Sequence, residues 1–86
     1  MKIRFHKNFE KQYKKPKDSE QKKTQERLSV FLQTPYSPIL NNHPLKGKYL
    51  DYRSINITGD LRAIYKDCGG DKCIFVAVDT HSNLYS

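Results

Sequence analysis

The stretch HPLKGKYLDYRSINITGDLRAIYK, residues 43–66, decides the fold of this chain. Its second half alternates between apolar and polar side chains, and the alternation breaks at Thr58-Gly59-Asp60. Gly and Asp tolerate the backbone angles that a tight turn requires. The stretch therefore predicts two antiparallel β-strands joined by a hairpin turn.

The predicted hairpin and its entry carry an unusual density of polar and cationic side chains. Cations this dense along one ribbon are typical of an anion-binding surface rather than of a surface that is merely soluble. The residues are His43, Lys46, Lys48, Arg53, Asp60 and Arg62.

The N-terminal part of the chain predicts one strand followed by two helices. Residues 2–6 alternate with period two, which indicates a short strand. Asn8 is expected to cap the first helix, which ends at Pro16, and the second helix ends before Pro35. We expect both helices to dock on one sheet face through their apolar residues, Phe9, Tyr13, Leu28, Phe31 and Leu32.

The rest of the chain supplies a linker and a last strand. Residues 36–48 are expected to be an extended linker, because Pro35 just before it and Pro38, Pro44 and Gly47 within it disfavour regular hydrogen bonding there. Residues 73–78 are apolar throughout and predict a strand inside the sheet. The predicted fold is α+β: two N-terminal helices packed on a twisted, mainly antiparallel sheet of about four strands, in the order β-α-α-β-β-β, as a single domain over residues 1–86.

Composition restricts the class of partner and the location. The chain of 86 residues has a formal net charge of +7. Residues 1–48 hold 12 basic and 4 acidic residues, whereas residues 49–86 hold 4 and 5. This imbalance indicates nucleic acid or an acidic protein as partner. No apolar run approaches the ~20 residues that span a bilayer, and no signal peptide is recognisable, so we expect a cytoplasmic protein without a membrane partner.

Two cysteines, Cys68 and Cys73, flank Gly69-Gly70 and are expected to face each other across a hairpin in reduced form. Two thiols cannot complete a structural zinc site. We therefore expect neither a metal nor a cofactor.

Four residues are candidates for catalysis. His81 follows the last strand, where its imidazole can transfer protons near neutral pH, and the alternative is a surface histidine near the terminus. Asp60 and Arg62 are expected on one sheet face, where they either orient a ribose and hold a phosphate or form an ordinary ion pair. His43 has its backbone restricted by the following proline, so it is either a second proton carrier or a linker histidine.

Four further residues are candidates for substrate binding. The planar guanidinium of Arg53 suits bidentate phosphate binding, unless Arg53 is only a solvated sheet residue. Lys46 and Lys48 surround a glycine that lets backbone and ammonium groups approach a phosphate together, and the alternative is a charged, soluble loop. Tyr85 either stacks on an unpaired base or holds the C-terminus against the core.

Three phrases of the sequence resemble those of a known family. These are HPLKG at residues 43–47, YRSINITGDLRAIYK at 52–66 and THSNLY at 80–85. Together they resemble the RelE/ParE superfamily of bacterial toxins, and the nearest branches are the YafQ-like and RelE/StbE-like ribonucleases. The resemblance implies a RelE-like fold and a type II toxin that binds a cognate antitoxin and cleaves mRNA on the ribosome.

The same resemblance implies how the site residues act. Cleavage proceeds by metal-independent attack of the ribose 2′-OH on the adjacent phosphate. His81 transfers a proton, and its counterpart is His43 or Asp60. Arg62 stabilises the phosphate during the reaction. The substrate-binding residues are Arg53, Lys46 and Lys48 at the phosphates, and Tyr85 at a base.

The sequence also departs from the family pattern. Ala77 stands where the YafQ-like ribonucleases have an arginine, and Asn56 and Leu61 stand where some members have a histidine and an aromatic residue. Two other functions therefore stay open. One is ParE-like inhibition of DNA gyrase without catalysis. The other is non-catalytic RNA binding, which is less favoured because the typical basic, aromatic-studded sheet pattern is absent.

Overall fold

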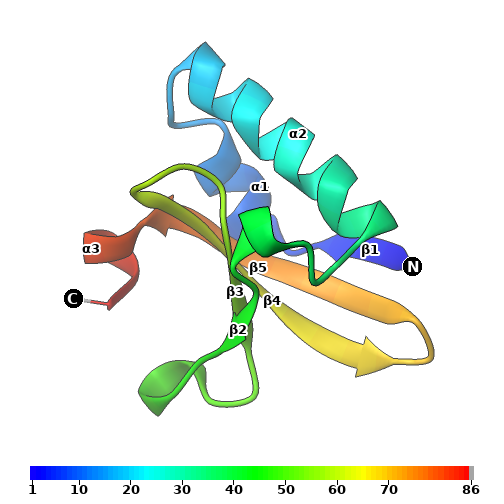
Figure 1. The fold of residues 1–86 in the computed structure, drawn as a ribbon. Helices are drawn as coiled ribbons and strands as arrows, with labels where there is room; N and C mark the ends of the chain where they lie inside the picture. The colour runs from blue at the N-terminus through cyan, green and yellow to red at the C-terminus, as the bar shows by residue number, and fades with distance from the viewer. Residues whose placement is uncertain (86) are drawn as a thin grey trace.

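One five-stranded sheet organises the protein, and the computed structural model describes it over residues 1–85 (Figure 1). The strand order is β1-β5-β4-β3-β2. β1 runs parallel to β5, and the other neighbouring pairs are antiparallel. The strands are β1 (Lys2–Phe5), β2 (His43–Pro44), β3 (Arg53–Asn56), β4 (Leu61–Gly69) and β5 (Lys72–Thr80).

The helices confirm the predicted α+β order and add three short elements to it. The two expected helices are α1 (Lys7–Tyr13) and α2 (Asp18–Gln33), and both precede the central hairpin. Residues 36–48 are not simply an extended linker, because they contain a 3-10 helix, β2 and the start of a second 3-10 helix. The added helices are η1 (Pro38–Leu40), η2 (Gly47–Tyr49) and α3 (His81–Tyr85). None of the helices within residues 1–85 has both the length and the apolar character needed to cross a lipid bilayer.

The cap of α1 differs from the prediction. His6 is the N-cap residue, and its Nδ1 accepts a hydrogen bond of 3.0 Å from the backbone N–H of Asn8. Asn8 lies inside the helix, where its side-chain amide donates to the carbonyl of Val76 at 3.0 Å. Asn8 therefore ties α1 to β5 instead of capping the helix.

The main core lies between the helices and one face of the sheet. Phe31 of α2 is fully buried and makes edge contacts with Tyr65 and Phe75, with ring centroids 4.9 and 5.2 Å away. Phe9 of α1 meets the ring of Phe75 at 5.8 Å. The expected contribution of Leu32 is wrong, because its side chain is 47% exposed. Burying large rings removes the most apolar surface per residue, which suits so short a chain.

A smaller core covers the opposite face of the sheet. Ile64, Ala77 and Leu84 are buried there. Leu84 comes from α3, and the loop formed by residues 45–52 packs its apolar side chains on the same cluster. In Figure 1 this loop and α3 lie on the other side of the sheet from α2. The face opposite the helices is thus only partly covered, and it is the face that carries the candidate site.

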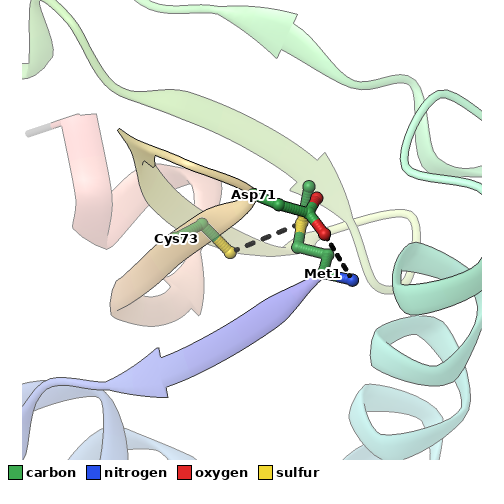
Figure 2. Close-up of polar contacts among 3 residues, drawn as sticks. All are labelled: Met1, Asp71 and Cys73. Carbon is green, nitrogen blue, oxygen red and sulfur yellow. Dashed lines mark hydrogen bonds and ion pairs between the residues drawn. The ribbon is translucent and has the colours of Figure 1, made fainter.

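The start of β1 is fixed to the turn between β4 and β5 (Figure 2). The α-amino nitrogen of Met1 lies 3.1 Å from a carboxylate oxygen of Asp71, and the sulfur of Met1 lies 3.8 Å from the Cys73 thiol. These contacts place the first residue of the chain beside the sheet and leave Cys73 only 1% exposed.

The two thiols should differ strongly in reactivity. Burial raises the pKa of the Cys73 thiol to about 11, and the nearby Cys68 and Asp67 add to the shift. At pH 8 such a thiol is ionised in about one molecule per thousand, and only the thiolate is nucleophilic. Cys68 is exposed. We expect iodoacetamide at pH 8 to modify Cys68 quickly and Cys73 slowly. Intact mass spectrometry over a time course measures the two labelling rates.

The Cys68→Ser variant supplies the control for this labelling. It should retain one slow thiol that becomes fast in urea, and its labelling rate in the folded state should rise as the pH approaches 11. Equal rates for both thiols in the folded protein would contradict the burial of Cys73.

Candidate active site

A polar cavity of about 400 Å³ opens on the sheet face that the two long helices leave free. Residues from β2, β3, β4 and α3 converge on it, although they lie far apart in the sequence. Its lining consists of Asn41, His43, Leu45, Ser54, Arg62, His81 and Tyr85. We call the space that these seven residues line the polar cavity.

Strand alternation decides which side chains reach the polar cavity. Ile55 and Ile57 are buried in the main core under the helices, so Ser54 and Asn56 must point to the opposite face. The register then places His43 of β2 opposite Ser54, and Arg62 of β4 opposite Asn56. The hairpin therefore brings His43 and Arg62 to the same side of the sheet.

His81 reaches the polar cavity from the first position of α3. Its backbone N–H donates to the carbonyl of Asp60 at 2.9 Å, which joins α3 to the hairpin turn. The hydroxyl of Thr80 accepts from the backbone N–H of Asn83 at 3.2 Å and so caps the helix. The imidazole of His81 is exposed and lies 4.7 Å, between ring centroids, from the ring of Tyr85. This exposed ring is free to meet a substrate.

The orientation of the His43 ring leaves one nitrogen available as a base. Its Nδ1 lies 2.7 Å from the carbonyl oxygen of Asn41. A carbonyl can only accept, so Nδ1 must carry the hydrogen in this contact. In neutral imidazole Nε2 is then an unprotonated acceptor, which is the form that a general base requires.

The guanidinium of Arg62 is held in place by the hairpin turn. Its Nη1 donates to the carbonyl oxygens of Thr58 and Gly59, at 2.9 and 3.0 Å. These bonds use one end of the planar group and leave Nε and Nη2 to bind an anion. A fixed cation of this kind stabilises developing negative charge without rearranging during a reaction.

Ser54 is a polar cavity residue that the sequence prediction missed. It is fully buried, and its hydroxyl has no hydrogen-bond partner within residues 1–85. Buried hydroxyls are normally paired, because leaving one unpaired costs about 1–3 kcal/mol. The hydroxyl oxygen has almost no exposed surface, so a ligand in the cavity can pair with it only when neighbouring side chains shift. Because Ile55 is a core residue, strand alternation places its neighbour Ser54 on the opposite face. This alternation is the sequence signal that could have identified Ser54.

Arg53 does not lie where the prediction placed it. Its Nε donates to the side-chain oxygen of Asn42 at 2.8 Å, and its guanidinium lies 5.3 Å from the ring centroid of Tyr36. Asn42 in turn donates to the hydroxyl of Tyr65, which belongs to the main core. Arg53 therefore points to the helix side of the sheet, away from Arg62 and His81.

The other predicted site residues fall into two groups. His43, Arg62, His81 and Tyr85 line the polar cavity together, as the sequence prediction requires for His81 and Arg62. Lys46, Lys48 and Asp60 do not line it. Lys46 is exposed, Lys48 lies over the ring of Tyr49 at 5.3 Å, and Asp60 contributes its backbone carbonyl to the placement of His81.

Comparisons with known proteins give a consistent result. A family model described as bacterial toxin of type II toxin-antitoxin system, YafQ, matches residues 1–86. The E. coli YafQ crystal structure is 22% identical, with a TM-score of 0.79, and the match covers 98% of this chain and 97% of YafQ. A YoeB/ParE toxin from Agrobacterium tumefaciens is 22% identical, with a TM-score of 0.76, over 94% of this chain and 99% of that one.

A third similar structure contains a second protein. YafQ in the E. coli DinJ-YafQ complex is 25% identical to this chain, with a TM-score of 0.71, over 98% of this chain and 97% of that one. Among curated proteins, none matches this chain. The structural likenesses agree on a RelE-like toxin fold, in which helices pack on a mixed sheet.

Proposed function

Because the chain belongs to the YafQ family of bacterial type II toxins, we propose that it is an endoribonuclease that cleaves mRNA on the translating ribosome in the cytoplasm. The observation that carries the proposal is the polar cavity. Two histidines and a fixed arginine, each from a different element, line one cavity of a size suited to part of a nucleotide. Proton transfer and anion stabilisation are the two requirements of RNA cleavage by the neighbouring 2′-OH.

We assign the proton transfers to the two histidines. Nε2 of His43 takes the proton of the ribose 2′-OH, and the 2′-oxygen forms a bond to phosphorus. The bond between phosphorus and the 5′-oxygen breaks, and protonated His81 donates a proton to that leaving oxygen. The products are a 2′,3′-cyclic phosphate and a 5′-hydroxyl. Asp60 is the less favoured counterpart, because its side chain is not in the cavity lining.

Arg62 and Ser54 act on the phosphate in this scheme. The free edge of the Arg62 guanidinium binds the phosphoryl oxygens as their negative charge grows. The unpaired hydroxyl of Ser54 donates to one of them or to the ribose. Tyr85 stacks on the base next to the cleaved bond, since its ring lies beside His81 and is 37% exposed.

A cognate antitoxin is the proposed protein partner. E. coli YafQ is found in a complex with DinJ, and this chain is 25% identical to that YafQ. The net charge of +7 favours a partner with an acidic segment. Such a segment would also compete electrostatically with RNA.

The Ser54→Ala variant separates function from stability. Removing a buried hydroxyl that has no partner should leave the free energy of unfolding unchanged or raise it by about 1 kcal/mol. Loss of one hydrogen bond to the reacting phosphate should reduce mRNA cleavage about 10-fold. Urea denaturation and a cleavage assay measure the two effects. Destabilisation by more than about 1 kcal/mol would show instead that the hydroxyl has a structural partner.

The proposed function is tested by inducing the wild-type protein in cells. Mapping of mRNA 5′ ends should show new ends within coding sequences, while DNA supercoiling by gyrase continues. Growth arrest with intact mRNA and blocked supercoiling would instead establish the ParE-like function.

A further inference from the structure

A second cavity of about 410 Å³ lies beside the polar cavity and has no role in the chemistry described above. It is floored by Val76 and Ala77, whose small side chains leave it open, and walled by the loop of residues 45–52 and the start of α1. Its lining consists of His6, Asn8, Lys48, Tyr49, Tyr52, Val76 and Ala77. We refer to it as the tyrosine cavity.

A continuous row of rings connects the two cavities. His81 and Tyr85 of the polar cavity lie 4.7 Å apart, and the ring of Tyr85 meets that of Tyr49 at 5.8 Å. Tyr49 in turn meets Tyr52 at 6.3 Å. The row therefore runs from the proposed proton donor into the tyrosine cavity, along one surface.

The fold of the loop explains how two tyrosines reach this surface. Backbone hydrogen bonds from Leu45 to Tyr52 (3.0 Å) and from Tyr52 to Tyr49 (2.9 Å) close the loop on itself. Gly47 has φ of 66°, a left-handed conformation that glycine adopts without strain. The loop is thus a defined turn, and its tyrosines pack at its base on the small core with Ile64 and Ala77.

Cations accompany the rings. The ammonium nitrogen of Lys48 lies 5.3 Å from the ring centroid of Tyr49, and that of Lys66 lies 5.7 Å from the centroid of Tyr52. No acidic residue is in the described lining of the tyrosine cavity. Rings with cations beside them are what a single strand of nucleic acid requires, because bases stack on the rings while phosphates meet the ammonium groups.

Two further hydrogen-bond donors face the same space. Nδ1 of His6 accepts from the backbone N–H of Asn8, so neutral His6 carries its hydrogen on Nε2. The pKa of Tyr49 is raised, chiefly by burial and then by Tyr85 and Asp79, so its hydroxyl stays protonated near neutral pH. Both groups can donate to phosphate or ribose oxygens.

We propose that the tyrosine cavity is a second RNA subsite, which binds the nucleotides of the single strand that adjoin the cleaved bond. The inference rests on the proposed ribonuclease function and specifies how that site holds its substrate. Tyr49 and Tyr52 stack on the bases of the adjoining nucleotides, and Lys48 and Lys66 bind their phosphates. The subsite explains how a small protein keeps the strand in register with His43 and His81.

The subsite is tested by titrating the ¹⁵N-labelled protein with two single-stranded RNAs in which 2′-O-methyl groups block cleavage. One is a dinucleotide, and the other is an oligonucleotide of about 8 residues, within the usual site sizes of single-strand binders. Amide shifts should change around the polar cavity with both RNAs. Only the longer RNA should also shift residues 48–52, Lys66 and 76–77.

Two variants measure the contribution of the subsite. Tyr52→Leu keeps an apolar side chain on the core but removes the ring, so it should weaken binding of the longer RNA about 5- to 150-fold and of the dinucleotide less than about twofold. Lys66→Ala changes an exposed residue that belongs to neither core cluster, and it should lower the salt dependence of binding by about 0.7 in log–log slope. Matched controls from the helix side are Tyr36→Leu and Lys22→Ala, which should bind as the wild type does.

The outcomes separate this inference from the proposed function. If Tyr52→Leu and Lys66→Ala bind the longer RNA as the wild type does, or if poly-glutamate binds the tyrosine cavity as well as RNA does, the subsite is wrong. In that case cleavage can still depend on His81. Conversely, binding in the tyrosine cavity together with undiminished cleavage by His81→Ala would overturn the proposed mechanism and leave the subsite standing.

Discussion

Replacement of His81 by alanine is expected to abolish growth arrest and to reduce mRNA cleavage by about 10²- to 10⁴-fold, the usual contribution of a general acid. The physical reason is that His81 is the exposed imidazole at the mouth of the polar cavity and the proposed proton donor to the leaving oxygen. Cleavage should be measured with purified protein on ribosomes programmed with mRNA.

The adjoining residue offers a matched control. Ser82 is exposed on α3 and does not line the polar cavity, so Ser82→Ala should cleave as the wild type does. The placement of α3 depends on the backbone N–H of His81, which alanine retains, and on burial of Leu84. His81→Ala should therefore unfold at nearly the wild-type temperature. Unchanged toxicity in this variant, with intact mRNA and blocked supercoiling, would show that the protein does not act as a nuclease.

Replacement of Arg62 by alanine should reduce cleavage by about 10²- to 10³-fold, the magnitude seen when one fixed donor to a developing negative charge is removed. Arg62→Lys should recover little of this loss. An ammonium group cannot keep two carbonyl contacts in the turn and also present a planar edge to phosphate. The effect should appear in the maximal rate more than in substrate binding.

Arg53→Ala is the comparison that makes the Arg62 result specific. Both residues are half-buried arginines on adjacent strands, but Arg53 contacts Asn42 and Tyr36 on the helix side of the sheet. We expect Arg53→Ala to lower the free energy of unfolding and to change the rate of cleavage by less than about fivefold. Equal losses of cleavage in both variants would contradict the assignment of the two faces.

Local patterns in the sequence were sufficient to predict the main elements. The turn at Thr58-Gly59-Asp60 and the period-two pattern around it identify β3 and β4, and prolines delimit α1 and α2. An unbroken apolar run likewise identifies β5 as an interior strand. These signals are local, because turn chemistry and side-chain periodicity depend on neighbouring residues.

Elements that depend on tertiary contacts were not predictable in the same way. β2 is two residues long and exists through pairing with β3, and α3 is a five-residue helix that covers the small core through Leu84. Leu32 fits the helical spacing of Phe31, yet the rotation of α2 about its axis exposes it. Thr24 of the same helix is fully buried, as Phe31 is. The side of α2 that carries Thr24 and Phe31 therefore faces the core.

The candidate site shows the same division. His43, Arg62, His81 and Tyr85 were identified from residue chemistry and family phrases, and the structure brings them to one cavity. The assignment of Arg53 ignored the alternation that sends it to the side of Ile55. The tyrosine cavity was not predicted, because Tyr49 and Tyr52 come from a loop and lie together only in the folded chain.

The chemistry of the cut ends tests the central claim most directly. Purified wild-type protein should be incubated with programmed ribosomes, and the ends of the cleaved mRNA identified by enzymatic ligation and mass spectrometry. Attack by the ribose 2′-OH predicts a 2′,3′-cyclic phosphate upstream and a 5′-hydroxyl downstream of the cut. Ends that carry a 5′-phosphate, or mRNA that stays uncut while the protein blocks gyrase, would contradict the account.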